Sequence, residues 1–466
     1  MIIKIVIYSF VFYSSVAKVV KIEENLLLSE NKRIFVALNK PNGTQTGKIM
    51  IQEFINKQFY NLFVFTYLFG LVLYGTIKFE GIDEICAMLL FILLIYGIFK
   101  STDWYVNKAF LTVIGIFVFY ACYSIYIHSN SKVAILSDFI IQFKPYLAFF
   151  AVYYLCPEFT KSQKKILRDV VYVIWAFMIA IGVASFVEPK IFNLTVGHVA
   201  YFAAIVTSSA MLFLFSSEGT NKDKVIFLLI LATGLLSGRA KFYGFFILAT
   251  AAIVFSRQVC HLKLNFKTIL VGCLCLAAII AASWQKLVLY FGVGQSLESV
   301  PEGYLARAML YATSFQIFQD YFPLGSGFAS FASFSSGVHY SDIYQEYGIE
   351  LIKGISKNNY SYIADTYYPC LAQFGVVGVI LYFFFFFYIF RKSLTLYQRS
   401  LSIKHFVIPF LIIGYFLIEN IADATFTSHR GFFIMMLLGL TLSESKKYIT
   451  QKDNSKSNSN SIQQPT

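Results

Sequence analysis

Two cations, Arg239 and Lys241, stand in a short polar turn between two strongly apolar segments. Placing two positive charges at a membrane boundary is costly unless something offsets them. Arginine suits phosphate because its planar guanidinium donates two parallel hydrogen bonds. The pair therefore predicts an anionic ligand at this boundary. The simpler alternative is that both side chains extend toward lipid headgroups.

A second group of candidates lies in a long polar interruption at residues 286–368. Arg307 falls within 302–320, whose apolar residues recur at helical spacing, and a solvated helix face is the alternative reading of its charge. Pro-Leu-Gly-Ser-Gly-Phe follows at 323–328, where the glycines allow a tight backbone with exposed N–H groups. Without a following lysine, this segment is a weak candidate for binding phosphate.

Acidic candidates occur where the polar interruption ends and near the last apolar segment. Asp365 could cap the next helix, or it could orient or deprotonate a hydroxyl group. Glu419 and Asp423 are four residues apart and share a face if their helix continues, with His429 and Arg430 nearby. Ordinary polarity at a helix end is the alternative for this cluster.

The composition predicts a membrane protein. Hydrophobic residues make up 58% of the 466 residues, charged residues 14%, and mean hydropathy is +0.65, whereas soluble domains are about 45–50% apolar and about 25% charged. Continuous apolar runs of about 16–22 residues can cross the bilayer as helices. We expect an all-α, polytopic integral membrane protein with about 12 transmembrane helices and one large external loop containing short helices.

The expected spans divide the chain into five parts. The spans lie near 60–77, 84–99, 109–128, 140–156, 170–187, 197–215, 225–237, 242–256, 268–285, 369–390, 405–421 and 431–444. The parts are an N-terminal cytoplasmic or interfacial extension (1–57), helices 1–9 (58–285), a large periplasmic loop (286–368), helices 10–12 (369–444) and a disordered cytoplasmic tail (445–466).

The distribution of basic residues predicts the orientation. One set of alternate loops carries 15 lysines and arginines and the other set carries 6, so we expect the first set in the cytoplasm. The interruption at 286–368 and the Arg239 turn then face outward. This asymmetry also accounts for the net charge of +13 without nucleic-acid binding.

The motifs together resemble the superfamily of O-antigen ligases and Wzy-type O-antigen polymerases of bacterial inner membranes. Ser-Gly-Arg at 237–239 is followed by Arg307, then by 322–328, and then by Asp-Thr-Tyr-Tyr-Pro-Cys-Leu-Ala-Gln-Phe-Gly-Val-Val-Gly at 365–378. The resemblance covers roughly residues 225–390. Ligases typically carry histidine and asparagine where this chain has Asp365 and Thr366, which favours a polymerase.

The resemblance implies roles for these residues. Members of the superfamily use undecaprenyl-diphosphate-linked glycans outside the inner membrane. Arg239 and Arg307 match its positively charged positions and would stabilise the diphosphate leaving group, with Lys241 added because of its location. Asp365 is our first choice for the residue that acts on the acceptor hydroxyl, and Asp423, also expected to bind substrate, is the second. We expect no cofactor and no metal.

We therefore expect a glycosyltransferase of the inner membrane that joins lipid-linked oligosaccharide repeat units. Its expected partners are undecaprenyl-diphosphate-linked glycans, membrane lipids and a chain-length regulator protein, but no nucleic acid. The enzyme alternative is an O-antigen ligase that transfers glycan to lipid A-core. The other alternative, a lipid-linked oligosaccharide flippase, predicts similar halves and charges buried in the middle of spans, for which Lys144 is the clear candidate.

Overall fold

The computed structural model describes residues 44–77, 79, 81–100, 107–255, 302–400 and 402–462, and this part is helical without a strand. Six of its helices are long and apolar enough to cross a membrane, which supports the expected all-α membrane protein. They are α4 (Ile82–Lys100), α5 (Lys108–Tyr126), α6 (Lys132–Leu155), α7 (Lys161–Ala184), α9 (Val199–Ser216) and the continuous stretch Tyr367–Ser400.

Of the other expected spans, 431–444 lies within a longer helix, His429–Ile462, and the rest are shorter, interrupted or outside the described residues. The expected span 60–77 is divided between α2 (Thr44–Tyr67), the π-helical turn η1 (Leu68–Val72) and α3 (Tyr74–Ile77). The expected span 268–285 lies outside the described residues. The shorter helices are α10 (Asn221–Thr233), α11 (Ala240–Val254) and α19 (Lys404–Glu419), and α11 is apolar.

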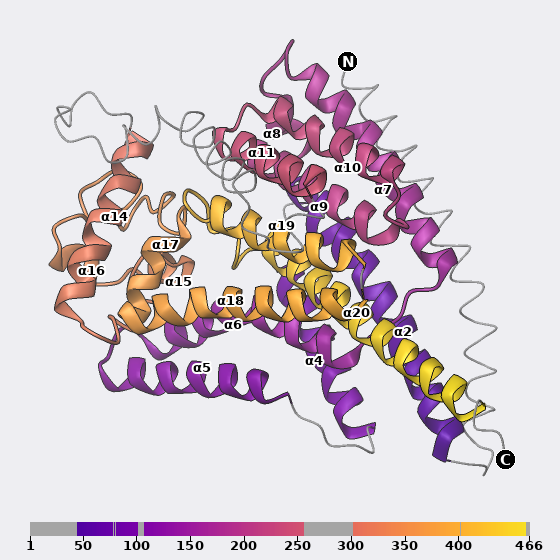
Figure 1. The fold of residues 1–466 in the computed structure, drawn as a ribbon. Coiled ribbons are helices and arrows are strands. Elements are labelled where there is room, and N and C mark those ends of the chain that lie inside the picture. Colours follow the sequence, from indigo (N-terminus) through magenta and orange to yellow (C-terminus); the bar gives the residue numbers. More distant parts are fainter. Residues whose placement is uncertain are drawn as a thin grey trace, which may run out of the picture.

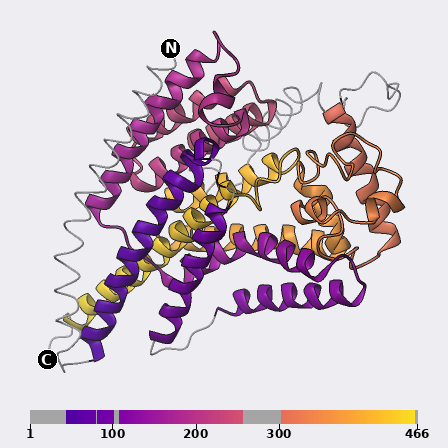
Figure 2. The ribbon, with the colours of Figure 1, turned by 180° about the vertical axis from the view of Figure 1, so that it is seen from behind.

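The helices form two neighbouring groups (Figures 1 and 2). In one group α20 (His429–Ile462) packs along α6, with α2, α4, α5 and α18 (Gly375–Ser400) around them. In the other, α7, α9, α10 and α11 pack together, and α9 and α11 contact α19. The short helices gather at one end of α5, α6 and α18: α14 (Glu302–Asp320), α15 (Phe334–Val338), α16 (Ile343–Glu346) and α17 (Tyr367–Cys370).

Several loops expected in the cytoplasm meet at the opposite end of the bundle. The Glu444 carboxylate forms ion pairs with Lys164, at 2.7 Å, and with Lys404, at 3.5 Å. Lys447 pairs with Glu158 at 2.8 Å. Glu444 lies 15 residues after His429 in α20, and this separation corresponds to about 22 Å along the helix. The basic loops are therefore separated from the candidate site residues by most of a membrane thickness.

The C-terminal segment differs from its expectation. We expected 445–466 to be a disordered tail, but α20 continues as far as Ile462. No glycine or proline interrupts residues 445–462, so the backbone can extend the preceding helix despite the polar composition.

Two glycines allow the motifs around 323–328 and 373–378 to pack backbone against backbone. Gly325 and Gly375 have φ values of +80° and +60°. A Cβ atom on Gly325 would lie 2.2 Å from the Gly375 nitrogen, and one on Gly375 would lie 2.3 Å from the Pro323 oxygen. This close approach connects the large loop to the start of α18. The two motifs of the resemblance are therefore parts of one structural contact.

The backbone N–H groups of the 323–328 segment and the residues after it bond within the protein, so the segment gains no support as a candidate for binding phosphate. Gly327 N–H donates to the Gln373 carbonyl at 2.8 Å, and Ser330 N–H donates to Gln373 Oε1 at 2.9 Å. Phe328 N–H donates to Ser124 Oγ and Ala329 N–H to Asp138 Oδ2, both at 2.7 Å. These donors are satisfied by α5, α6 and the α18 motif.

We predict that Gly325→Ala destabilises the protein by about 3 kcal/mol or more, because the new Cβ meets backbone atoms as well as an unfavourable φ. Gly348→Ala is the matched control: its φ is +65°, but a Cβ there has nothing within 4 Å. The control should lose only about 1 kcal/mol. Thermal unfolding of both variants in detergent measures the difference, and equal losses would contradict the packing explanation.

Candidate functional site

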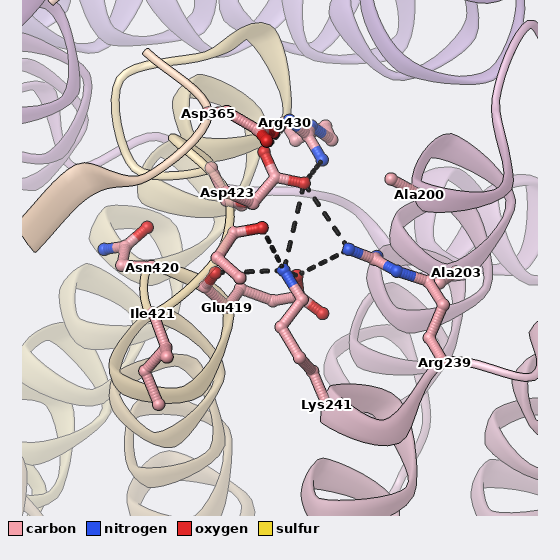
Figure 3. A network of polar contacts seen from close by, with 12 residues as sticks. Ala200, Ala203, Arg239, Lys241, Asp365, Glu419, Asn420, Ile421, Asp423 and Arg430 are labelled. Carbon is pink, nitrogen blue, oxygen red and sulfur yellow. Dashed lines mark hydrogen bonds and ion pairs between the residues drawn. The ribbon is translucent and has the colours of Figure 1, made fainter. Parts of the chain in front are cut away.

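The Arg239 turn places two cations at the start of α11. The 3₁₀ turn η2 (Gly234–Ser237) ends α10, and Gly238 takes a left-handed conformation with φ +63°. Arg239 is then the N-cap residue of α11, and Lys241 is the second residue of the helix. Both side chains point toward the end of α19 and the loop that follows it (Figure 3).

Lys241 is held by three oxygen atoms. Its ammonium group lies 2.7 Å from Glu419 Oε2 and donates to the carbonyls of Glu419 at 3.1 Å and Ala422 at 3.0 Å. A lysine ammonium has three N–H donors, so these contacts account for all of them. Lys241 therefore joins α11 to the end of α19 and has little capacity left for a ligand.

Arg430 and Asp423 form a bidentate ion pair at the site. The two terminal nitrogens of Arg430 donate to the two oxygens of Asp423 at 3.0 and 2.7 Å. Asp423 lies in the loop between α19 and α20. The neighbouring cations, Arg430 first among them, hold the pKa of the Asp423 carboxyl well below its usual range despite burial. Asp423 is therefore a permanent carboxylate and a weak base.

Arg239 is held more loosely than the other cations of this cluster. Its guanidinium lies 3.4 Å from Glu419 Oε2 and 3.5 Å from Asp423 Oδ2, at the outer limit of a hydrogen bond. Its side chain retains 14% exposure. Both carboxylates have a closer cationic partner, Lys241 for Glu419 and Arg430 for Asp423. Arg239 therefore keeps hydrogen-bonding capacity for a bound anion, since its contacts with both carboxylates are long.

Arg307 and Asp365 form an ion pair beside this cluster. Arg307 comes from α14 and also lies over the Tyr362 ring, 5.9 Å from its centroid. Burial raises the pKa of Asp365 to about 6, although Arg307 opposes the shift. Thr366, rather than Asp365, is the N-cap residue of α17, so Asp365 does not cap the next helix.

The two groups surround one site. Figure 3 shows Asp365 next to Asp423 and Arg430, and Asp365 interacts electrostatically with Asp423 and Lys241. Tyr311 of α14 donates to the Ile421 carbonyl at 2.7 Å, which ties the Arg307 helix to the loop that carries Asp423. The expected walls of the site, the large loop and the Arg239 turn, thus meet across the α19–α20 loop.

The site carries more cations than carboxylates. Its cations are Arg239, Lys241, Arg307 and Arg430, and its carboxylates are Asp365, Glu419 and Asp423. With every group ionised, the described part of the site has a net charge of +1. Protonation of Asp365 would raise this charge further. An anionic group is therefore favoured here over a cationic one.

Sequence reasoning left out two aromatic neighbours of the site, Tyr74 and Tyr201. The His429 ring stacks on Tyr74, with 3.5 Å between centroids, and the Arg430 guanidinium lies 5.3 Å from the Tyr201 ring centroid. Tyr74 and Tyr201 stand near helix ends, where an aromatic belt at the membrane surface has the same appearance in sequence. The long-range contacts of Arg430 likewise have no sequence signal.

We predict that the stability difference between Asp365→Asn and the wild type depends on pH. The folded-state pKa of Asp365, about 6, is above its ordinary value. The associated stability is therefore present below about pH 4 and is lost as pH rises through about 6. The Asn variant should gain thermal stability relative to wild type between about pH 4 and 6. Asp423→Asn should show a difference that is flat over this range, because that pKa is depressed; equal pH dependence in both variants would contradict the assignment.

Comparisons with known proteins do not assign this chain to a family. No family model matches the sequence, and no curated protein matches it. A functional assignment therefore rests on the charged site and on the order of the motifs.

Proposed function

We propose that this protein is a membrane glycosyltransferase that joins undecaprenyl-diphosphate-linked oligosaccharide repeat units outside the inner membrane. The observation that carries the proposal is the combination of a loosely held arginine, Arg239, with the Arg307–Asp365 pair at one end of a helical membrane bundle. The cations would stabilise the negative charge of a diphosphate, and the carboxylate would accept the proton of an acceptor hydroxyl. The motif resemblance supplies the substrate class.

In the proposed reaction, the hydroxyl oxygen of one lipid-linked repeat attacks the anomeric carbon of another lipid-linked chain. A new carbon–oxygen bond forms at the anomeric carbon, and the bond from that carbon to the diphosphate oxygen breaks. Its electron pair leaves with undecaprenyl diphosphate, and the hydroxyl proton passes to Asp365. Direct displacement inverts the anomeric centre.

Arg239 and Arg307 would stabilise the negative charge that develops on the leaving diphosphate. Binding of the diphosphate to Arg307 would draw this guanidinium away from Asp365 and leave the carboxylate available to the acceptor hydroxyl. Lys241 and Asp423 would instead hold the ends of α11, α19 and α20 together, since their contacts within the protein are short. This changes the roles expected for both residues from binding substrate to positioning Arg239.

The pKa values favour Asp365 over Asp423 as the base. A general base works best when its pKa lies near the working pH. The pKa of Asp365 is raised to about 6 by burial, whereas cations depress that of Asp423. Asp423 would also have to break a bidentate contact with Arg430 before it could accept a proton.

The alternatives have less support in the described residues. Lys144 is buried, as a flippase predicts, but its partners Asp83 and Glu84 lie in the first turn of α4. These three residues border a cavity that also reaches the 364–370 turn, so they belong to the end of the bundle that holds the site. A ligase remains distinguishable by a deletion strain: loss of a polymerase leaves one repeat on the surface lipid, and loss of a ligase leaves none.

We predict that Arg239→Ala abolishes long polymer while single-repeat product remains, because removal of one such charge lowers the rate by about 10²–10³. Arg307→Ala should behave in the same way. Lys190→Ala is the matched control, because Lys190 is an exposed cation in the neighbouring loop expected on the same face. Gel analysis of surface polysaccharide, with immunoblotting for membrane expression, measures the result. Normal chain length in both arginine variants would overturn the proposal.

We also predict that polymerisation by purified protein rises with pH through about 6, because Asp365 must lose its proton to act as base. Below this pH, the rate should fall about tenfold per pH unit. Asp365→Asn should lack activity across the range, while Asp365→Glu keeps a part of it. A rate that is independent of pH between about 5 and 7 when chemistry is rate-limiting would remove Asp365 from the role of base.

A further inference from the structure

A cavity of about 730 Å³ opens beside the charged site. Ligand-binding cavities commonly have volumes of about 300–1,000 Å³, so this one can hold a small molecule or one to two sugar rings. Its walls come from the start of α4, the outer half of α6, α15 and the turns at 364–370 and 424–429. It therefore lies between the membrane helices and the large loop.

The cavity adjoins the residues proposed to react. Ala364 and Tyr367, on either side of Asp365 in sequence, line one wall. Ala424 and His429, which flank the loop between Asp423 and Arg430, line another. The cavity thus reaches the backbone segments that carry Asp365 and Asp423.

The lining combines aromatic rings with hydrogen-bonding groups. Tyr74, Tyr367 and Phe334 contribute rings, and Ser137, Ser333 and Ser428 contribute hydroxyls. A sugar presents C–H groups on its faces and hydroxyls around its rim, so it needs both kinds of contact. A second cavity of about 320 Å³, between α5 and α18, is lined largely by apolar side chains such as Val113, Phe117 and Phe385. The larger cavity therefore offers more hydrogen-bonding groups than the smaller one, beside apolar side chains of α6 such as Leu136 and Ile140.

His429 has an unused hydrogen-bonding atom in this lining. The residue is 5% exposed, and its Nε2 is buried without a hydrogen-bond partner within the described structure. The ring cannot easily turn away, because it stacks on Tyr74 at 3.5 Å. Buried polar atoms are nearly always hydrogen-bonded. A hydroxyl group of a ligand in the cavity would supply the missing partner.

The charge of the cavity excludes an anion as the preferred ligand. Lys144 is buried and pairs with both Asp83 and Glu84, so this group has a net charge of −1 when ionised. The second oxygen of Glu84, Oε2, is buried without a hydrogen-bond partner in the described structure. Carboxylates accept hydrogen bonds from hydroxyls but repel phosphate. The diphosphate thus belongs at the arginines, and an uncharged polyhydroxyl group belongs in this cavity.

We infer that the cavity binds the acceptor saccharide, meaning the sugar end of the lipid-linked repeat whose hydroxyl attacks. His429 Nε2 and Glu84 Oε2 contact sugar hydroxyls, and the cavity walls direct the attacking hydroxyl to Asp365. This inference rests on the proposed function and adds a subsite to it. It separates a neutral acceptor site from the cationic donor site.

The test uses full-length protein in detergent and the oligosaccharide released by mild acid from the lipid-linked repeats of a deletion strain. Saturation-transfer NMR and calorimetry measure its binding. We expect His429→Phe to weaken binding at least about tenfold, because stacking on Tyr74 is kept and the hydrogen-bonding atom is lost. His429→Gln should stay within about threefold of wild type. Ser137→Trp, which fills the cavity, should abolish binding.

Val113→Trp is the matched control, because it fills the apolar cavity with the same side chain and should leave binding unchanged. Thermal unfolding verifies that each variant is folded, and the His429 pair provides the answer if Ser137→Trp is not. Binding by wild type that neither His429→Phe nor Ser137→Trp weakens would overturn the acceptor site. Absence of binding by wild type would also overturn it. In both cases loss of polymer in Arg239→Ala would leave the proposed function standing, whereas normal polymer in that variant would remove the function itself.

Discussion

The arrangement of the site depends on Asp423, a mostly buried carboxylate that has to be paired with positive charge. It holds Arg430 through two short hydrogen bonds and lies within 3.5 Å of Arg239 and 4.0 Å of Lys241. These cations come from α20 and from the start of α11. A buried charge without a partner is strongly destabilising, so the ends of α11, α19 and α20 must meet at this carboxylate.

This pairing divides the cations into two kinds. Arg430 and Lys241 make contacts of 2.7 Å with carboxylates and serve as structure, while Arg239 remains at 3.4 Å or more. The proposed enzyme would need donors that are held in place before the substrate arrives. The structural cations provide that support, and the loosely held arginine keeps its hydrogen-bonding capacity. Asp365 differs again, because burial raises its pKa to about 6 and Arg307 balances its charge.

The two glycine motifs influence the site from a distance. The approach of Gly325 to Gly375 attaches the large loop to the first turn of α18, just after the turn that carries Asp365. Gln373 extends the attachment by accepting hydrogen bonds from the loop backbone. These motifs therefore position the carboxylate rather than contact phosphate.

The sequence by itself determined the class of the molecule and most of the residues at the site. Apolar runs predicted a helical membrane protein, and their interruptions drew attention to Arg239, Arg307, Asp365 and Asp423. Tertiary structure alone decided which of these residues pair with one another. Asp423 pairs with Arg430 and Asp365 with Arg307, and the N–H groups of 323–328 turn inward. Hydropathy and local spacing report whether a segment is buried, but a charge finds its partner only when helices distant in sequence pack together. The pKa of a carboxylate, and hence its chemical role, is decided by that packing.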